Sequence, residues 1–502
     1  MFNKVLIANR GEIAVRVLRS CRELGLQTVA VFSDADRTAP HVLMADEAVR
    51  IGPPPSSESY LQMGHLLEAA AKTGAEAIHP GYGFLSESGP FARQVEAAGL
   101  VWIGPPARII DEMGDKLAAR KRAVEAGVPI VPGLDDATAD PALLLQAAED
   151  MGYPVLVKAA GGGGGKGMRR VERAEDLPGA LETARSEAGS AFADDRVYLE
   201  KYLSAPHHIE VQIFADQHGR TVSLGERECS VQRRYQKVVE ETPSPFISDD
   251  LRRELGEAAV RIASACGYIG AGTVEFLVDG EQNFHFLEMN TRLQVEHPVT
   301  ELVTGLDLVA EQLRVASGEP LSFSAADIRP LGHAIECRIY AEDGFDGFAP
   351  SIGTILELTT PGGPGVRLDH GIRAGMEISP YYDPLLGKLC TWGANRDQAR
   401  RRMSRALEEL RIVGVRTTVP FCVAVMEHPA FVEGRYDTHF IDRYIGELSR
   451  HAARSNAHLP AVAALGAALY AERESPRPNH RAGGTGATSP WLEAGRRRQR
   501  SR

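Results

Sequence analysis

Apolar and polar residues alternate along two short runs near the middle of the chain. The alternation places Glu275 on one face of a strand over residues 273–278, and it places Glu288 and Asn290 with the two phenylalanines of residues 284–290. An Asp-Gly pair between the runs is typical of a turn. We therefore predict a hairpin in which Glu275 lies opposite Glu288.

Two carboxylates directly opposite each other destabilise a sheet unless a positive charge lies between them. Mg²⁺ that is bound together with phosphates takes one or two carboxylates plus substrate oxygens. The side chains of Glu275, Glu288 and Asn290 could supply these protein ligands. A hairpin face that is simply solvated would show the same residues, so both interpretations stay open on this pair alone.

Strand-like and helix-like patterns alternate through residues 4–104. Four apolar runs predict strands: residues 5–8, 28–32, 75–80 and 100–104. Strands that alternate with helices form a parallel, Rossmann-like sheet, whose ligands approach the carboxyl ends of the strands. The loops at residues 9–12 and 79–84 are therefore candidate binding loops. A dinucleotide has little support, because the first turn lacks the GxGxxG pattern.

Five consecutive glycines, residues 161–165, lie between two short strand-like runs and are flanked by Lys158 and Lys166. Glycine permits positive φ angles, so that backbone N–H groups can converge on anionic oxygens. The run does not match a Walker A loop, because Lys166 is followed by glycine and not by serine or threonine. We interpret it as a lid over phosphates, with a plain flexible connection as the alternative.

Further along, residues 207–216 alternate cleanly and place His208, Glu210 and Gln212 on one face. Such a strand usually buries only one face, so the polar face points either to solvent or to a site. Residues 228–241 carry more charge than a loop needs. Residues 331–440 are rich in strand patterns and glycine, which predicts a mixed α+β domain.

Composition narrows the class of protein. The 502 residues, 43% hydrophobic and 25% charged, suit a soluble protein of two to four domains. Six scattered cysteines without a CxxC motif fit a reducing cytoplasm and predict neither a zinc site nor a disulfide framework. No apolar segment approaches the length of about 18 residues that a membrane span needs. The net charge of −11 argues against a general nucleic-acid binder.

Lysine is rare in the chain. Only nine of the 56 basic residues are lysine, and Lys388 is the only one beyond Lys237. Where lysine persists against this bias, the position can require a compact point charge in place of a planar guanidinium.

Several long motifs, taken together and in order, resemble biotin carboxylase, an ATP-grasp enzyme. They are ANRGEIAVRV, MGDK, KAAGGGGGKGM, EKYL, RECSVQRRYQK, EMNTRLQVEHPVTE and GHAIECRIYAED, and the resemblance runs from about residue 2 to 446. It implies an α/β and α+β architecture: a Rossmann-like pre-ATP-grasp domain, an ATP-grasp domain with a glycine-rich lid, and a mixed C-terminal biotin carboxylase domain. The expected boundaries are residues 1–112, 113–330 with the lid at about 131–203, and 331–446, followed by a largely disordered tail at 447–502.

The resemblance implies carboxylation of biotin by bicarbonate, driven by cleavage of ATP to ADP and phosphate. It further implies that bicarbonate attacks the γ-phosphate and gives carboxyphosphate, which releases CO₂ beside biotin and leaves phosphate as the base. ATP and Mg²⁺ (or Mn²⁺) are the implied cofactors. Such a reaction depends on neutralising and aligning the anions, with little covalent chemistry by the protein.

The resemblance also implies which residues bind the nucleotide and the metal. Glu275, Glu288 and Asn290 would hold the metal. The nucleotide would contact Lys116, Lys158, Gly163, Gly164, Gly165, Met168, Glu200, Lys201, Leu203, His208, Gln232, Tyr235, Lys237, Glu275, Leu277 and Glu288. Tyr235 stands where the family commonly has histidine near the ribose, and Lys166 replaces a more usual arginine in the lid.

Bicarbonate and biotin are assigned by resemblance to six residues: Arg292, Gln294, Val295 through its backbone, Glu296, Arg338 and Tyr82. The planar guanidinium of Arg292 matches a planar carboxy anion. Glu296 would take the proton of bicarbonate, and Arg338 would stabilise the biotin enolate. The spacing of Arg292, Gln294 and Glu296 would aim all three in one direction if the segment is extended. A surface Arg–Glu pair is the alternative.

No Met-Lys pair typical of a biotinyl domain is present in the chain. We therefore expect biotin on a separate biotin carboxyl carrier protein, together with a carboxyltransferase subunit; the resemblance implies a homodimer. We expect no nucleic-acid or membrane partner and a cytoplasmic location. The sequence does not indicate the final carboxyl acceptor, such as acetyl-CoA, propionyl-CoA or pyruvate.

Two other functions compete with this one. Another ATP-grasp ligase, forming carbamoyl phosphate or joining a carboxylate to an amine, could share the lid and the metal carboxylates. Arg338 and Tyr82 argue against it. A catalytically silent assembly subunit is the other alternative, and the intact residues Lys237, Arg292 and Glu296 argue against that.

Overall fold

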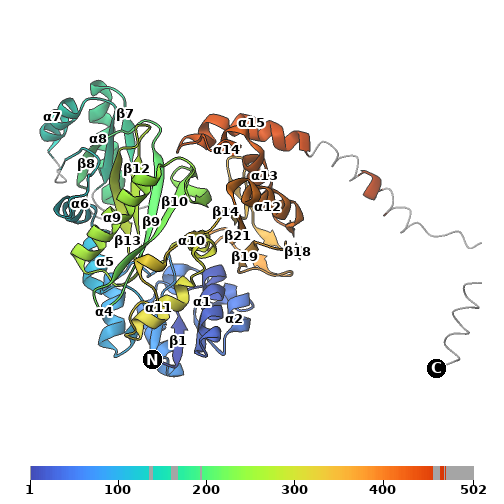
Figure 1. The fold of residues 1–502 in the computed structure, drawn as a ribbon. Helices are drawn as coiled ribbons and strands as arrows, with labels where there is room; N and C mark the ends of the chain where they lie inside the picture. Colours follow the sequence, from blue (N-terminus) through green and yellow to red (C-terminus); the bar gives the residue numbers. More distant parts are fainter. Residues whose placement is uncertain are drawn as a thin grey trace, which may run out of the picture. The chain divides into compact units, whose positions relative to one another are not determined.

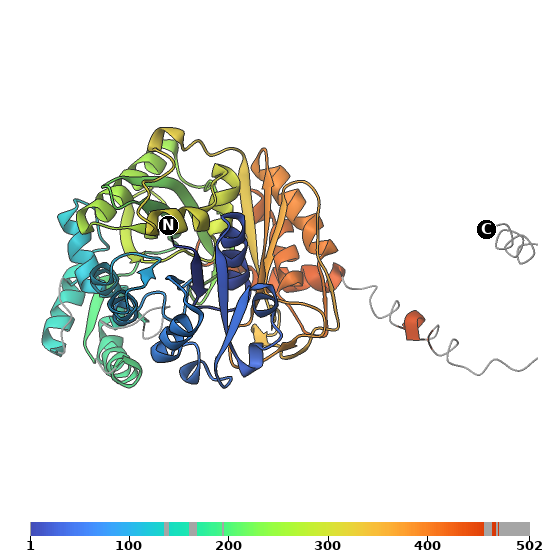
Figure 2. The ribbon, with the colours of Figure 1, turned by 90° about the horizontal axis from the view of Figure 1, so that it is seen from below.

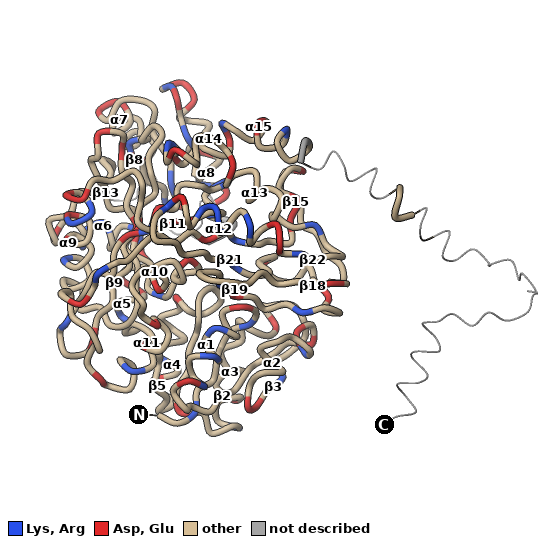
Figure 3. Tube along the Cα trace, turned by 45° about the vertical axis from the view of Figure 1, so that its right-hand side comes forward, with Lys and Arg blue, Asp and Glu red and all other residues tan. Residues whose placement is uncertain are grey.

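The computed structural model describes residues 2–134, 140–159, 168–192, 195–455, 464–467 and 470. The chain divides into two units, residues 1–452 and 453–502, and all described strands lie in the first. None of the described helices is long and apolar enough to span a bilayer. Acidic and basic positions are interspersed along the first unit (Figure 3).

A parallel five-stranded sheet forms the N-terminal part, with strand order β3-β2-β1-β4-β5. Its strands are β1 (Lys4–Ile7), β2 (Gln27–Ser33), β3 (Glu47–Gly52), β4 (Ala77–His79) and β5 (Val101–Trp102). One face packs on α1 (Gly11–Glu23), and the other packs on α3 (Met63–Thr73) and α4 (Gly89–Ala97). The Rossmann-like prediction is confirmed. β3 was not predicted, because only its last two residues are buried.

An antiparallel eight-stranded sheet forms the middle of the first unit, with order β13-β12-β9-β10-β11-β14-β21-β19 (Figure 1). Its strands are β9 (His207–Ala215), β10 (Thr221–Arg233), β11 (Gln236–Thr242), β12 (Gly270–Val278), β13 (Phe284–Asn290), β14 (His333–Tyr340), β19 (Val366–His370) and β21 (Leu385–Gly393). The pairing of β11 with β14 joins the expected ATP-grasp and C-terminal domains in one sheet. The sequence did not indicate this continuity.

Helices cover both faces of this sheet. The apolar residues of β9 and β12 pack on α5 (Ala107–Gly114), α6 (Lys116–Glu125) and α9 (Asp249–Cys266). On the other face, α10 (His297–Thr304) lies against β10, β11, β14 and β21, and α11 (Leu308–Ala316) lies against α1. The polar face of β9 is therefore enclosed, and every residue of β9 is buried. Of the two alternatives left open for the polar face, solvent or a site, the burial of every residue excludes solvent.

The predicted hairpin is β12 and β13, and Glu275 is the cross-strand neighbour of Glu288 as expected. The prediction that Glu288 and Asn290 share a face with the two phenylalanines is wrong. The register shifts between Glu275 and Phe276, which pairs with Phe286. This bulge inserts one extra residue into β13 and reverses the alternation. Phe286 and Met289 consequently both enter the apolar core.

The lid is built on a three-stranded antiparallel sheet of order β7-β6-β8, with β6 (Val155–Ala159), β7 (Arg169–Val171) and β8 (Val197–Lys201). Helices α7 (Pro141–Met151) and α8 (Leu177–Phe192) pack on it. The two strands expected around the glycine run are therefore present, whereas the run itself, residues 160–167, lies outside the described residues.

In the C-terminal part, α12 (Arg396–Glu409), α13 (Val419–Glu427), α14 (Pro429–Val432) and α15 (Phe440–Ser455) pack against β14 and β21. The short strands β15 (Glu342–Asp343), β16 (Ala349–Pro350), β17 (Gly353–Thr354), β18 (Glu357–Thr359), β20 (Glu377–Ile378) and β22 (Arg411–Val413) form three further pairs. Figure 2 shows α1 between the ATP-grasp and C-terminal parts. Helix α15 extends past the expected domain boundary at residue 446 and ends at Ser455, and most of the remaining tail lies outside the described residues, so the expected disorder there stays a prediction.

Candidate active site

Lys237 lies at the centre of a buried cluster of carboxylates. Its Nζ donates to Glu210 Oε2 at 2.5 Å, to Glu275 Oε1 at 2.9 Å and to Glu296 Oε1 at 2.8 Å. These carboxylates come from β9, β12 and the residue just before α10. A buried ammonium is tolerated only when such partners compensate for its lost hydration. Lys237 therefore connects carboxylates from three separate segments of the chain.

Arg338 binds the second carboxylate oxygen of Glu296, whose first oxygen accepts from Lys237. Its Nη2 donates to Glu296 Oε2 at 2.9 Å, and its Nε donates to Glu240 Oε1 at 2.5 Å. Burial by itself would raise the pKa of Glu296, but the positive charges of Lys237, Arg338 and Arg227 outweigh burial and hold that pKa well below its usual range. Glu296 is thus an ionised carboxylate held between two cations.

Arg227 is a further buried cation that hydrogen-bonds to residues of the cluster, and the sequence did not predict its role. Its guanidinium, fully buried, donates to Glu210 Oε1 through Nε, and to Gln294 Oε1 at 3.1 Å through Nη2. It also donates to Gln212, Thr273 and Thr300. The available signal was the polar face of β9, which places Glu210 and Gln212 together without a cation.

The candidate metal ligands lie on the two strands of the hairpin, toward its open end. Asn290 Nδ2 donates to Glu275 Oε1 at 3.0 Å, while His208 Nε2 lies 2.9 Å from Glu275 Oε2. Glu288 lies on β13 directly opposite Glu275 of β12, and Lys116 Nζ is 3.7 Å from the Oε2 of Glu288. Two carboxylates and an amide oxygen within one hairpin match the oxygen ligands that Mg²⁺ prefers. The residues present therefore fit the metal.

The segment after β13 does not stay extended. Residues 291–296 form bends and a turn, and Glu296 is the N-cap of α10. Gln294 Nε2 donates to Glu275 Oε1 at 2.8 Å, whereas Arg292 donates to Glu87 Oε2 at 2.9 Å and to Asn290 Oδ1 at 3.0 Å. The predicted extended geometry is wrong. Gln294 and Glu296 still reach the same cluster, and Arg292 borders it through Asn290.

Two further cations were predicted to contact the nucleotide, and they lie beside the hairpin (Lys116) and in the lid sheet (Lys158). Lys116 begins α6, whose N-terminus is capped by the side chain of Asp115. Lys158 on β6 donates to Glu200 on β8, which also accepts from Arg120 at 2.7 Å. Glu200 is therefore held between a lysine and an arginine inside the lid sheet, separate from the carboxylates around Lys237.

Other predicted nucleotide contacts vary in their accessibility. Lys201 Nζ donates to Gly152 O at 2.8 Å, so its ammonium group binds the backbone of the lid. Tyr235 is 54% exposed at the β10–β11 turn, with a φ of 68°. Gln232 is buried, whereas Met168, Leu203 and Leu277 are half-buried. Gly163, Gly164 and Gly165 lie outside the described residues.

The two candidate loops of the N-terminal sheet contact each other. Asn9 Nδ2 donates to Pro80 O and to Tyr82 O, both at 2.7 Å. A side chain at Gly81, whose φ is +64°, would come within 3.0 Å of Asn9 Nδ2. Close packing thus fixes Tyr82, which is half-buried. Its hydroxyl is buried without a hydrogen-bond partner among the described residues.

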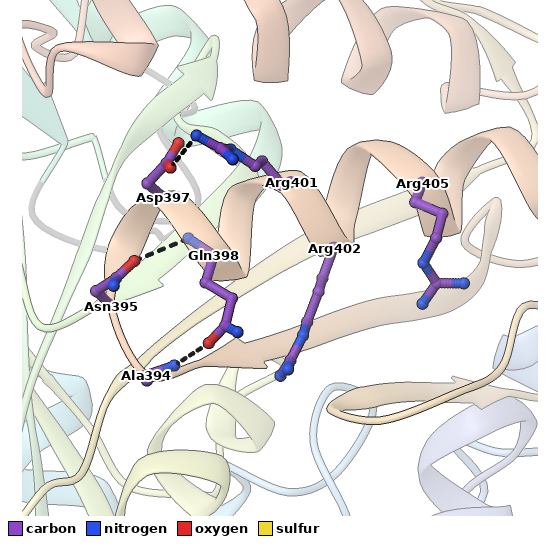
Figure 4. Close-up of a pocket in the computed structure, with 7 residues that line it drawn as sticks. All are labelled: Ala394, Asn395, Asp397, Gln398, Arg401, Arg402 and Arg405. Atoms are coloured by element: carbon purple, nitrogen blue, oxygen red, sulfur yellow. Dashed lines mark hydrogen bonds and ion pairs between the residues drawn. The ribbon is translucent and has the colours of Figure 1, made fainter.

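A separate surface hollow of about 540 Å³ lies along the first turns of α12. Figure 4 shows that Gln398 accepts from Ala394 N and that Arg401 pairs with Asp397. None of the residues that line this hollow belongs to the cluster around Lys237. The hollow is therefore separate from the candidate active site.

Three family models match the chain along nearly the whole first unit. They are "Biotin carboxylase, N-terminal domain" over residues 1–110, "Carbamoyl-phosphate synthase L chain, ATP binding domain" over residues 115–324 and "Biotin carboxylase C-terminal domain" over residues 336–443. The chain belongs to the biotin carboxylase family. These matches confirm the resemblance that the sequence motifs indicated. Members of this family are ATP-dependent ligases with an ATP-grasp fold.

Relatives in this family match over most of their own length. A pyruvate carboxylase subunit of Methanothermobacter thermautotrophicus is 52% identical over 444 residues, which cover 88% of this chain and 90% of that protein. Biotin carboxylase of Haemophilus influenzae is 51% identical over 450 residues, 89% of this chain and 99% of that protein.

A solved structure with the same fold was determined with bound ligands. The biotin carboxylase domain dimer of Hydrogenobacter thermophilus 2-oxoglutarate carboxylase, in complex with MgADP, ADP and bicarbonate, has a TM-score of 0.87 and 47% identity. The match covers 89% of this chain and 99% of that one. The Campylobacter jejuni biotin carboxylase complex with β,γ-ATP has a TM-score of 0.86 at 44% identity, over 88% and 99% of the two chains.

Proposed function

We propose that this biotin carboxylase carboxylates biotin carried by a separate protein, with ATP and bicarbonate as co-substrates and carboxyphosphate as intermediate. One observation carries the proposal: Glu296 binds Lys237 through one oxygen and Arg338 through the other. A base at this point faces the phosphoryl donor on one side and the biotin site on the other. A single carboxylate can thus couple the two halves of the reaction.

In the first step Glu296 would take the proton of bicarbonate, and a bicarbonate oxygen would attack the γ-phosphorus while ADP leaves. Arg292, Gln294 and the backbone of Val295 would hold the bicarbonate anion. Lys237 would follow the developing negative charge, because it lies within hydrogen-bonding distance of three carboxylates and can exchange one for a phosphate oxygen. As Lys237 shifts, the pKa of Glu296 would rise, which favours proton uptake.

In the second step carboxyphosphate would break into CO₂ and phosphate, and phosphate would remove the ureido proton of biotin. The biotin nitrogen would then attack CO₂ and form the carbon–nitrogen bond of carboxybiotin. Arg338 would stabilise the negative charge on the ureido oxygen, and Tyr82 would pack beside the ring. Arg338 is preorganised for this role, since Glu240 and Glu296 fix its guanidinium.

Glu275, Glu288 and Asn290 would hold Mg²⁺ (or Mn²⁺), which supplies charge neutralisation for the nucleotide phosphates. Lys116, Lys158, His208 and the glycine run would contribute the remaining positive charge and hydrogen-bond donors. Arg120 compensates Glu200 inside the lid, so the ammonium of Lys158 can reach toward phosphate without leaving a carboxylate unpaired.

The proposed partners are a biotin carboxyl carrier protein, a carboxyltransferase subunit and a second copy of the chain. The relatives include subunits of multi-subunit carboxylases, among them a pyruvate carboxylase and a propionyl-CoA carboxylase. The names of these relatives give different carboxyl acceptors, pyruvate and propionyl-CoA. The carboxyltransferase subunit would therefore determine which acceptor is carboxylated. Streptavidin blotting of the purified chain should detect no covalent biotin, and a positive blot would reject the separate carrier.

Bicarbonate-dependent ATP hydrolysis, measured with and without free biotin, tests the proposed function. We expect hydrolysis that requires bicarbonate and is stimulated by biotin. Hydrolysis without biotin stimulation would favour another ATP-grasp ligase. An absence of hydrolysis at any substrate concentration would favour a silent assembly subunit.

A further inference from the structure

Lys388 is a buried charge to which the proposed reaction assigns no role. It is the only lysine beyond Lys237 in a chain with nine lysines among 56 basic residues. Its side chain projects from β21 and is fully buried. An ammonium at such a position destabilises the fold unless other groups compensate for its lost hydration. The contacts of Lys388 must therefore account for its presence.

Those contacts come from both other parts of the first unit. Nζ donates to Val295 O at 2.6 Å, lies 3.5 Å from Glu12 Oε1 and lies 5.7 Å from the ring centroid of Tyr82. Glu12 belongs to the first turn of α1, and its two oxygens lack hydrogen-bond partners among the described residues. One ammonium thus joins β21 to α1, to the loop at residues 79–84 and to the turn before α10.

The strand register places Lys388 beside the catalytic cluster. It is the cross-strand neighbour of Arg338 on β14 and of Asp369 on β19. Residues that lie directly opposite on antiparallel strands project from the same face of the sheet. Lys388 and Arg338 therefore project from the face on which Glu296 lies.

Resting on the proposed function, we propose that Lys388 is a positioning residue for the bicarbonate end of the site. By binding the Val295 carbonyl it fixes the peptide unit that joins Val295 to Glu296. That peptide unit sets the point from which the Glu296 carboxylate reaches Lys237 and Arg338. A compact ammonium is required because a planar guanidinium needs more room than a fully buried position offers.

Steady-state kinetics of Lys388→Met tests the proposal. We expect kcat/KM for bicarbonate to fall on the order of 10²-fold, the effect of a small misplacement of reacting groups, while KM for ATP stays unchanged. Lys72→Met is the matched control, because Lys72 is an exposed lysine on α3. Its bicarbonate kinetics should equal those of the wild-type chain.

The double variant Glu12→Gln/Lys388→Met, measured above pH 7, separates positioning from stability, because at that pH Lys388→Met alone leaves the buried carboxylate of Glu12 without its cation. We expect the double variant to recover the thermal unfolding midpoint but not the bicarbonate kinetics. Glu12→Gln alone should keep those kinetics, since the bond to Val295 remains.

Recovery of the kinetics together with the midpoint would overturn the proposal. Failure of both variants to fold would overturn it as well, because Lys388 would then have a purely structural role. A wild-type chain without bicarbonate-dependent ATP hydrolysis would instead reject the proposed function, so the two failures are distinguishable.

Discussion

Replacing Glu296 with glutamine removes the proposed base and keeps the shape of the side chain. In the folded chain Glu296 accepts from Lys237 at 2.8 Å and from Arg338 at 2.9 Å. An amide oxygen can still accept from one of these cations, but an amide cannot take the proton of bicarbonate. Positioned general bases contribute about 10²–10⁴-fold to a rate. The expected loss in kcat corresponds to about 3–5 kcal/mol of activation free energy.

The fold should survive this substitution, because every cation around Glu296 keeps a carboxylate. Lys237 retains Glu210 and Glu275, and Arg338 retains Glu240. Binding of MgATP, measured by calorimetry, should therefore be unchanged. The variant separates binding from chemistry, which a substitution of Lys237 would not.

The assay is bicarbonate-dependent ATP hydrolysis in the presence of biotin. Glu226→Gln is the matched control: Glu226 is also buried, but its carboxylate pairs with Arg252 at 2.8 Å, away from the cluster. The control should keep its turnover. A Glu296→Gln chain that binds MgATP and retains kcat within about tenfold of the wild type would refute the base assignment.

Three further predictions concern other charged groups. Arg338→Met should lower biotin carboxylation by about 10²–10³-fold and leave the slower ATP hydrolysis without biotin intact; an equal loss of both, measured side by side, would contradict a role toward biotin. Arg227→Met should destabilise the fold by about 3–5 kcal/mol in urea unfolding, because it leaves Glu210 with one cation, and an unchanged midpoint would contradict this. Burial raises the pKa of Glu12 from 4.5 to about 7, so the folded chain holds a proton there that the unfolded chain releases. The resulting stability is complete below pH 4.5 and is lost as pH rises to about 7. Glu12→Gln should lack this loss of about 3 kcal/mol, and parallel stability curves for the two chains would contradict it.

The elements of the fold follow well from local patterns. Strand and helix alternation predicted the parallel sheet, and the turn signal between two alternating runs predicted the hairpin with Glu275 opposite Glu288. The bulge in β13 could not be foreseen, because one inserted residue leaves the alternation of each half intact. β3 was not predicted, because most of its residues are not buried. These errors arise where register, not local composition, decides the side-chain direction.

The site was predicted less completely. The motif residues Lys237, Glu275 and Glu296 do come together. Arg227 and Glu240 were missed, because their roles depend on neighbours in other strands whose register the sequence does not display. Pairing of β11 with β14 brings Glu240 beneath Arg338. Contacts between residues almost a hundred positions apart are set by the assembled sheet.

Transfer of labelled carbon tests the central claim most directly. The purified chain would be incubated with MgATP, ¹⁴C-bicarbonate and free biotin, and both ADP and acid-labile labelled carboxybiotin would be quantified. The proposed function predicts that labelled carboxybiotin forms, that it requires ATP, and that its amount does not exceed the ADP released. Release of ADP with no label in biotin, at biotin concentrations that saturate ATP hydrolysis, would contradict it.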